Sequence, residues 1–199
     1  MVEVVSATRH LLRAFAWLAL PGAVLAHVLD EYLQATLLDI EPGEVRLQIN
    51  LTPGVAVADQ VLAQVDRDHN GTISTKEAAA YAESLKRDLT LRLDKHVLDL
   101  KLTASEFPAP AELRTGWGII QLQFSAKRGR LDSGPHKLTL ENRHLNDLSV
   151  FLVNATQPRS AAIRIDGQKR NDNQSEAEIK FTFSPVAQSR GTESANVSH

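Results

Sequence analysis

The sequence predicts a mainly β fold, a β-sandwich with one helix–loop–helix inserted between two of its strands. Apolar and polar residues alternate over many short segments, and turn-forming residues separate these segments at near-regular intervals. One stretch, residues 55–89, has helical instead of strand periodicity. Aromatic residues make up only 5% of the chain, so we expect a core built mainly from Leu, Val and Ile.

The alternating segments define the strands of the expected sandwich. The clearest is 45–51, in which every second residue is apolar. The other expected strands are 32–40, 89–93, 98–102, 117–124, 137–141, 149–153, 161–165 and 179–183. Trp117 and Phe124 are expected to lie in the core. Many short strands joined by turns are typical of an Ig-like sandwich, and we expect one domain over residues 27–183.

The helical stretch is interrupted by a loop rich in oxygen-bearing side chains, residues 66–77. Apolar residues recur at helical spacing on both sides of the loop: Val57, Val61, Leu62 and Val65, then Ala78, Tyr81, Ala82, Leu85 and Leu89. The loop ends in Ser-Thr-Lys-Glu, a capping-box pattern, so the second helix is expected to begin inside the loop.

The spacing of the oxygen-bearing residues is that of a calcium site. Calcium takes about six to eight oxygen ligands, and loops of this kind supply them from positions 1, 3, 5, 7, 9 and 12. These positions hold Asp66, Asp68, Asn70, Thr72 (through its carbonyl), Ser74 and Glu77, with Gly71 at the sharp turn. The loop therefore resembles that of the EF-hand family, which implies Ca²⁺ as its ion. The alternative is an Asp- and Asn-rich turn between two helices.

EF-hands usually occur in pairs, and this chain offers one. Segments 166–169 and 171–174 lack the ligand spacing and the closing glutamate. A mate would have to come from a protein partner or from self-association through the unpaired EF-hand. Arg67 and His69 weaken the negative field of the loop, so we expect an affinity of about 10⁻⁴–10⁻³ M, as in extracellular modules.

Residues 1–26 have the features of a secretory signal peptide. Arg9 and Arg13 precede an apolar run, residues 14–26, that ends in Val-Leu-Ala, a small-x-small cleavage pattern. The run is shorter than the roughly 20 residues that a membrane-spanning helix needs, and no later stretch is apolar enough. We expect a bacterial protein exported to the periplasm or beyond, with a mature start at His27 and no membrane span. The alternatives are a buried N-terminal helix or an uncleaved anchor.

Composition excludes several classes of function. Removing residues 1–26 takes away two arginines and one glutamate, a net charge of +1, so the charge of −2 becomes −3. Such a surface does not favour nucleic acid. The chain has no cysteine and therefore no disulfides. It has no nucleophile elbow, zinc-binding helix motif or phosphate loop, so no enzyme is expected. Residues 184–199 are small and polar, and a disordered tail is expected.

A second resemblance involves residues outside the loop. His27, Glu31-Tyr-Leu33 and Glu141-Asn-Arg-His144 resemble the exported N-terminal region of HupE/UreJ-type membrane proteins, which are associated with nickel or cobalt handling. The resemblance implies an extracytoplasmic sensing or accessory domain. That family continues into membrane helices, which are not expected here, so transport is not carried over.

Two alternative functions stay open at this point. In the first, the amine and imidazole of His27 hold copper or nickel, with a further ligand from His96, His136 or His144. In the second, the chain is a soluble domain that docks to a membrane transporter. His144 beside Asp147 also allows acid–base chemistry, although an exposed polar turn is the preferred interpretation.

Overall fold

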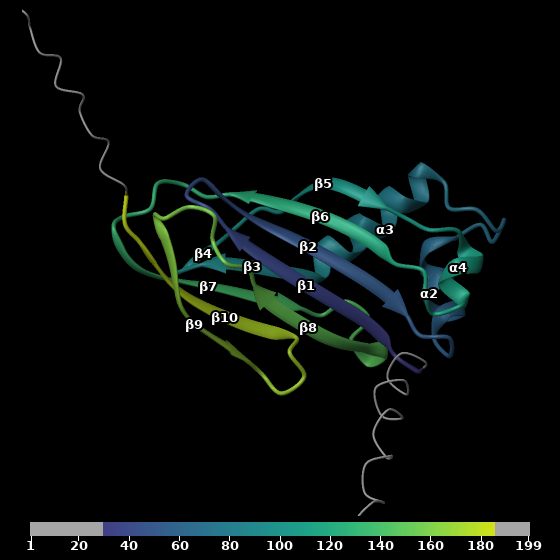
Figure 1. Ribbon diagram of the computed structural model, residues 1–199. Coiled ribbons are helices and arrows are strands. Elements are labelled where there is room, and N and C mark those ends of the chain that lie inside the picture. The colour runs from purple at the N-terminus through teal and green to yellow at the C-terminus, as the bar shows by residue number, and fades with distance from the viewer. Residues whose placement is uncertain (1–29, 186–199) are drawn as a thin grey trace, which may run out of the picture.

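The computed structural model describes residues 30–185, which form two five-stranded β-sheets and three α-helices around one apolar core (Figure 1). The prediction of a mainly β fold is confirmed. The expected signal peptide, His27 and all but the first two residues of the expected tail lie outside the described residues.

The first sheet has the strand order β5-β6-β2-β1-β8. Its strands are β1 (Tyr32–Ile40), β2 (Glu44–Pro53), β5 (Lys101–Glu106), β6 (Ile120–Lys127) and β8 (Ser149–Ala155). β1 and β2 form a hairpin paired from Tyr32 opposite Pro53 to Ile40 opposite Val45. β8 joins β1 in parallel, and the other pairs are antiparallel.

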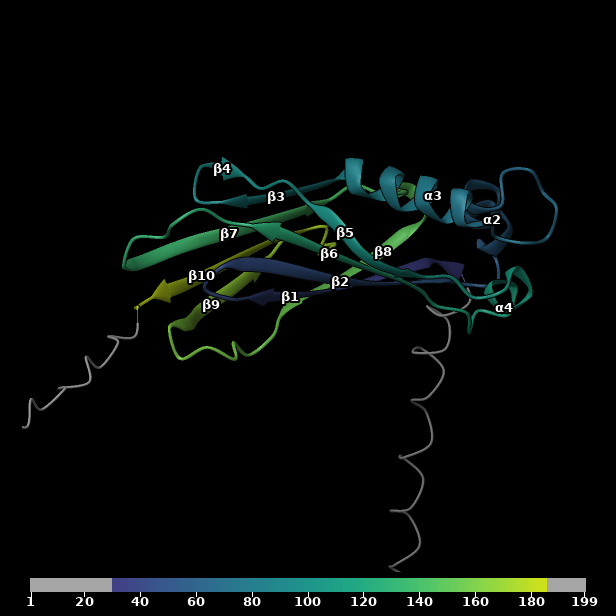
Figure 2. The same cartoon turned by 90° about the horizontal axis from the view of Figure 1, so that it is seen from above.

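The second sheet has the strand order β4-β3-β7-β10-β9, and all its pairs are antiparallel. Its strands are β3 (Leu89–Leu93), β4 (His96–Val97), β7 (Gly134–Asn142), β9 (Ile163–Arg170) and β10 (Glu176–Phe183). Seen from above, β3 and β7 lie in a different layer from β1 and β2 (Figure 2).

The alternation in the sequence determines which side chains enter the core. In β2 the apolar side chains at every second position, Val45 to Leu51, are at most 1% exposed, while the polar residues between them face outward. β3 repeats this with Leu89, Leu91 and Leu93. Because successive side chains of a strand point to opposite faces, each sheet contributes one apolar face to the shared core.

Three helices gather at one end of the sheets (Figure 1): α2 (Ala58–Val65), α3 (Thr75–Asp88) and α4 (Pro110–Arg114). α2 and α3 connect β2 of the first sheet with β3 of the second, so the helix–loop–helix is a crossover between the sheets. α4 was not predicted. Its first residue is Pro110, whose fixed φ suits the start of a helix. Among residues 30–185, no helix is long and apolar enough to cross a membrane.

The structure corrects the predicted strand 98–102. The chain instead forms two-residue β4 beside β3, and then crosses to the first sheet, where β5 pairs with β6. Leu100 lies in the connection between β4 and β5, and its side chain is buried. It is therefore apolar because the connection passes through the core, and not because it belongs to a strand.

A second correction concerns Trp117. The strand predicted over 117–124 begins at Ile120, and Trp117 lies before it, 78% exposed instead of in the core. Phe124 is 1% exposed, as predicted. β1 and β3 have the predicted bounds, 32–40 and 89–93. The other predicted strands are present with shifted ends; β9 begins at Ile163 and β10 at Glu176.

Candidate metal centre

The loop of residues 66–77 is held between the end of α2 and the start of α3. Asp66 is the C-cap of α2, and its N–H donates to the carbonyl of Leu62 at 2.8 Å. Ser74 is the N-cap of α3, and the predicted capping box is present. The Ser74 Oγ accepts from the N–H of Glu77 at 3.3 Å, while Glu77 Oε2 accepts from the N–H of Ser74 at 3.0 Å. The side chain of Glu77 is thereby directed back into the loop.

Three carboxylates meet in this loop. Asp66, Asp68 and Glu77 each offer an oxygen, and these oxygens lie within 4.8 Å of one another. In the described part of the chain, they are the one group of three or more acidic, histidine or cysteine side chains with this proximity. Asp66 and Glu77 are 6% and 9% exposed, whereas Asp68 is exposed. Negative charges this close repel each other unless a cation lies between them.

Backbone N–H groups point at all three carboxylates, and Asp68 Oδ1 accepts from the N–H of Asn70 at 3.1 Å. Asp66 accepts from the N–H of Asn70 at 3.2 Å and of Gly71 at 3.0 Å, and Glu77 Oε1 accepts from the N–H of Arg67 at 2.8 Å. Hydrogen bonds to Glu77, first from the Ser74 hydroxyl and then from backbone N–H groups, lower its pKa to about 2. Glu77 is therefore ionised at neutral pH.

Two of the other predicted ligands, Asn70 and Ser74, are tied to the carboxylates by hydrogen bonds. Asn70 Nδ2 donates to Asp68 Oδ2 at 2.9 Å, and Ser74 Oγ donates to Glu77 Oε2 at 2.7 Å. Thr72 lies on the exposed side, where its N–H and Oγ–H both donate to Asn70 Oδ1. A carboxylate oxygen has two lone pairs, so each oxygen of Asp66 and Asp68, which accepts one of these bonds, keeps capacity for a cation. Each oxygen of Glu77 accepts two hydrogen bonds, so a cation bound at Glu77 would have to displace some of them.

The turn of the loop uses two residues in the left-handed region. Gly71 has φ of +79°, as expected for the glycine of a sharp turn. His69 has φ of +56°, which the sequence did not indicate. Its side chain is exposed, in agreement with a solvent-facing position.

The donor set fits a hard cation. All six predicted ligand positions offer oxygen, and no nitrogen or sulfur ligand lies in the acidic group. Carboxylate and carbonyl oxygens suit calcium and magnesium, whereas copper and nickel prefer imidazole. If the loop binds a metal, Asp66, Asp68 and Glu77 would supply the charge.

Two of the histidines considered as transition-metal ligands are already engaged. His136 Nδ1 lies 2.9 Å from Asp94 Oδ2, and its Nε2 lies 2.9 Å from the Asp132 carbonyl oxygen. His144 Nδ1 lies 2.7 Å from Asp88 Oδ2, and its Nε2 lies 3.1 Å from the Tyr81 hydroxyl. The two histidines are near opposite ends of β7, so one metal ion cannot bind both.

The pairing of His144 was missed by sequence reasoning, which considered Asp147 as its neighbour. The structure instead places His144, 3% exposed, against Tyr81 and Asp88 of α3. A weak signal was present in the sequence, because Tyr81 and Asp88 share the inward stripe of α3 with Leu85.

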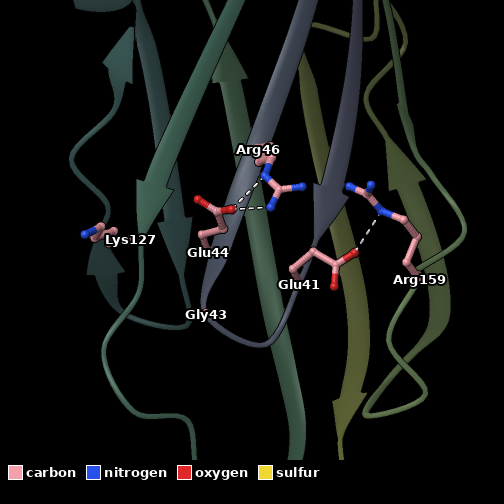
Figure 3. Close-up of a pocket in the computed structure, with 6 residues that line it drawn as sticks. All are labelled: Glu41, Gly43, Glu44, Arg46, Lys127 and Arg159. Carbon is pink, nitrogen blue, oxygen red and sulfur yellow. Dashed lines mark hydrogen bonds and ion pairs between the residues drawn. The ribbon is translucent and has the colours of Figure 1, made fainter. Parts of the chain in front are cut away.

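A polar hollow lies at the turn between β1 and β2, lined by Glu41, Gly43, Glu44, Arg46, Lys127 and Arg159 (Figure 3). Arg46 Nε donates to Glu44 at 2.7 Å, and Arg159 Nε donates to Glu41 at 3.3 Å. These pairs neutralise the charges that an ionic ligand would need. Since β2 is ten residues long, the hollow is about 30 Å from the helical end of that strand.

Comparisons of the chain with protein-family models, curated proteins and solved structures gave no match, so the functional argument depends on the fold and on the acidic loop.

Proposed function

We propose that this chain is an exported calcium-binding module. One EF-hand, with its loop at residues 66–77, would hold Ca²⁺ and thereby stabilise or weakly regulate an Ig-like β-sandwich formed by the two sheets. The expected ligands are Asp66, Asp68, Asn70, Thr72, Ser74 and Glu77.

The observation that carries the proposal is the meeting of three carboxylates from the two ends of one loop. Asp66 ends α2 and Glu77 lies in the first turn of α3, and with Asp68 their oxygens come within 4.8 Å. Glycine at the turn and the oxygen-only donor set agree with calcium chemistry.

Calcium would act on the fold through the two helices. The ion would neutralise the repulsion among Asp66, Asp68 and Glu77 and draw the end of α2 towards the start of α3. Both helices pack on the core through buried faces, which include Val61 of α2 and Leu85 of α3. Fixing the loop should therefore raise the stability of the whole domain.

Export and partners belong to the same proposal. Export rests on the pattern of residues 1–26. The described residues contain one helix–loop–helix of this kind, so a mate for the EF-hand would come from a protein partner or a second copy. Of the further ligands considered for copper or nickel binding at His27, His136 and His144 use both ring nitrogens in other contacts, which leaves the exposed His96 as the remaining candidate.

The test is calorimetric calcium titration of the chain from His27 onwards, which contains the complete described core. We expect one ion to bind and the melting temperature to rise with calcium relative to chelator. Glu77→Gln removes a ligand charge and should weaken binding at least tenfold. Glu83→Gln is the matched control, since Glu83 lies on the same helix and pairs with Lys86 on its exposed face.

The proposal fails if the unmodified protein takes up no calcium at millimolar concentration, or if Glu77→Gln binds as tightly as Glu83→Gln. A titration with magnesium in place of calcium separates the two hard cations. Tighter magnesium binding would assign the loop to magnesium instead.

A further inference from the structure

One face of α3 connects the acidic loop with a buried polar cluster. Glu77, Tyr81, Leu85 and Asp88 are spaced by four, four and three residues, so they lie along one side of the helix. Glu77 reaches into the loop, whereas Tyr81 and Asp88 bond to His144. A helix of 14 residues spans about 20 Å, so movement at one end displaces the other.

When His144 is neutral, each donor in this cluster has an acceptor, and the hydrogen bonds run in one direction, from Tyr32 through Tyr81 and His144 to Asp88. The Nδ1–H of His144 donates to Asp88 at 2.7 Å, which leaves Nε2 as an acceptor. Nε2 then accepts from the Tyr81 hydroxyl at 3.1 Å. The Tyr81 oxygen in turn accepts from the hydroxyl of Tyr32, 2.5 Å away.

Protonation of His144 would reverse this direction. Nε2–H would donate to the Tyr81 oxygen, and the hydroxyl protons of Tyr81 and Tyr32 would then share the single Tyr81–Tyr32 contact. One of these two protons would lack an acceptor among the described contacts, at a side chain that is at most 1% exposed. A buried donor without a partner is costly, so this placement of α3 favours neutral His144.

The surroundings of His144 leave little room for an alternative arrangement. Its carbonyl accepts from Gln34 Nε2 at 2.7 Å, and its N–H donates to Asn142 Oδ1 at 2.9 Å. Gln34 and Asn142 are themselves joined by a 2.9 Å hydrogen bond. The charged and titratable groups that face the ring are Tyr81 and Asp88 of α3, with Tyr32 of β1 beyond. The exposed Arg143 turns towards Glu141.

We propose that His144, in its neutral form, is a positioning residue for the calcium loop. It acts through Tyr81 and Asp88 to hold α3, and with it Glu77, where the closing carboxylate meets Asp66 and Asp68. Calcium and the proton on His144 are then antagonists, because calcium binding needs the helix placement that protonation disfavours. The inference depends on the proposed calcium site, and it adds a pH dependence that the loop does not supply.

The test measures calcium affinity between pH 5.5 and 7.5, above the range in which carboxyl groups usually titrate. His69 lies in the loop between two of the proposed ligands, so all proteins carry His69→Gln, which removes this second imidazole from the measurement. We expect the dissociation constant to rise about fivefold or more towards pH 5.5, the lower end of usual coupling between sites. His144→Gln, which cannot titrate in this range, should flatten the dependence.

A second measurement keeps the test sharp if His144→Gln folds poorly. Asp88→Asn keeps the acceptor for Nδ1–H but removes the charge that favours imidazolium, so the midpoint of the pH dependence should move to lower pH. Linkage also requires that calcium lower the pKa of His144, which NMR of its ring reports directly.

The outcomes separate the two proposals. Absence of calcium binding at every pH overturns both the calcium site and this inference. Calcium binding with an affinity independent of pH, or a His144 titration that calcium leaves unchanged, overturns the inference alone.

Discussion

The hydroxyl oxygens of Tyr32 and Tyr81 lie 2.5 Å apart inside the core, joining the first strand of the first sheet to the helix that follows the acidic loop. Burial, the largest cause for both residues, raises the pKa of each tyrosine, so both stay neutral. Tyr81 also meets the rings of Phe107 and His144 edge to face. α3 is thus held on the sheet by directional contacts as well as by apolar packing.

Phenylalanine substitutions at the two tyrosines should have unequal effects. Tyr81→Phe removes both the donor to His144 and the acceptor for Tyr32, so we expect a loss of about 1–3 kcal/mol in unfolding free energy. Tyr32→Phe leaves the Tyr81–His144 bond intact and should cost less. Urea denaturation in chelator measures both values. Equal losses, or a larger loss for Tyr32→Phe, would contradict the proposed direction of the hydrogen bonds.

Acidification should destabilise the domain through His144. Burial lowers the pKa of His144, and it outweighs the opposing effect of Asp88. The unfolded chain, with histidine near 6.5, then binds the proton more readily than the folded one. Unfolding free energy should therefore start to fall near pH 6.5 and continue down to the folded pKa. Urea midpoints from pH 8 to 5 in chelator test this, with exposed His69→Gln as control. A slope unchanged in His144→Gln would refute it.

His136 should act in the opposite direction. Burial is the largest single contribution and lowers the pKa of His136. The hydrogen bonds to the Asp132 carbonyl and to Asp94 raise the pKa, and together they outweigh burial, so the net change is upward. The stabilisation is present below the unfolded pKa and disappears as pH rises through the folded one. Asp94 is 41% exposed, so solvent limits the effect to about 1 kcal/mol or less. His136→Gln should therefore destabilise more at pH 5.5 than at pH 8; the reverse order in urea denaturation would contradict this sign.

Gly71 and Gly43 form a matched pair for testing the loop conformation. A Cβ at either position meets nothing within 4 Å, but Gly71 has φ of +79°. Gly71→Ala should cost about 1–2 kcal/mol of unfolding free energy from backbone strain alone. Gly43→Ala should stay within about 0.5 kcal/mol of the unmodified protein. Urea denaturation in chelator compares the two variants, and equal stability of both would show that the loop tolerates another conformation.

Gly118 tests the tight turn after α4. A Cβ there would lie 2.7 Å from the Leu113 nitrogen and 2.8 Å from the Glu112 carbonyl carbon, both backbone atoms. We expect Gly118→Ala to destabilise by about 1–3 kcal/mol through this overlap. Exposed Gly129, where a Cβ meets nothing within 4 Å, supplies the control. The melting temperatures of the two alanine variants test this prediction. Equal melting temperatures for Gly118→Ala and Gly129→Ala would contradict the tight contact.

The sequence alone was sufficient for features that repeat at short range. Alternation identified β2 and the side chains that it buries, and helical spacing together with the capping box located α2 and α3. The ligand spacing of the loop identified the three carboxylates that meet within 4.8 Å. These patterns can be recognised because neighbouring residues fix them, through the pleat of a strand, the turn of a helix or the reach of a short loop.

Only the tertiary structure decided which distant residues meet. Trp117 is the first residue of an apolar segment that predicts a buried strand, yet its side chain is exposed, because β6 begins three residues later, at Ile120. Only Lys101 and Leu102 of the segment 98–102 lie in a strand, because β4 ends at Val97 beside β3 and the chain then crosses to β5, which pairs with β6. His144 finds Tyr81 and Asp88 only because α3 packs beside the end of β7. Local periodicity carries no information about such partners. The partners are determined by how the buried faces of the two sheets and the helices pack against one another.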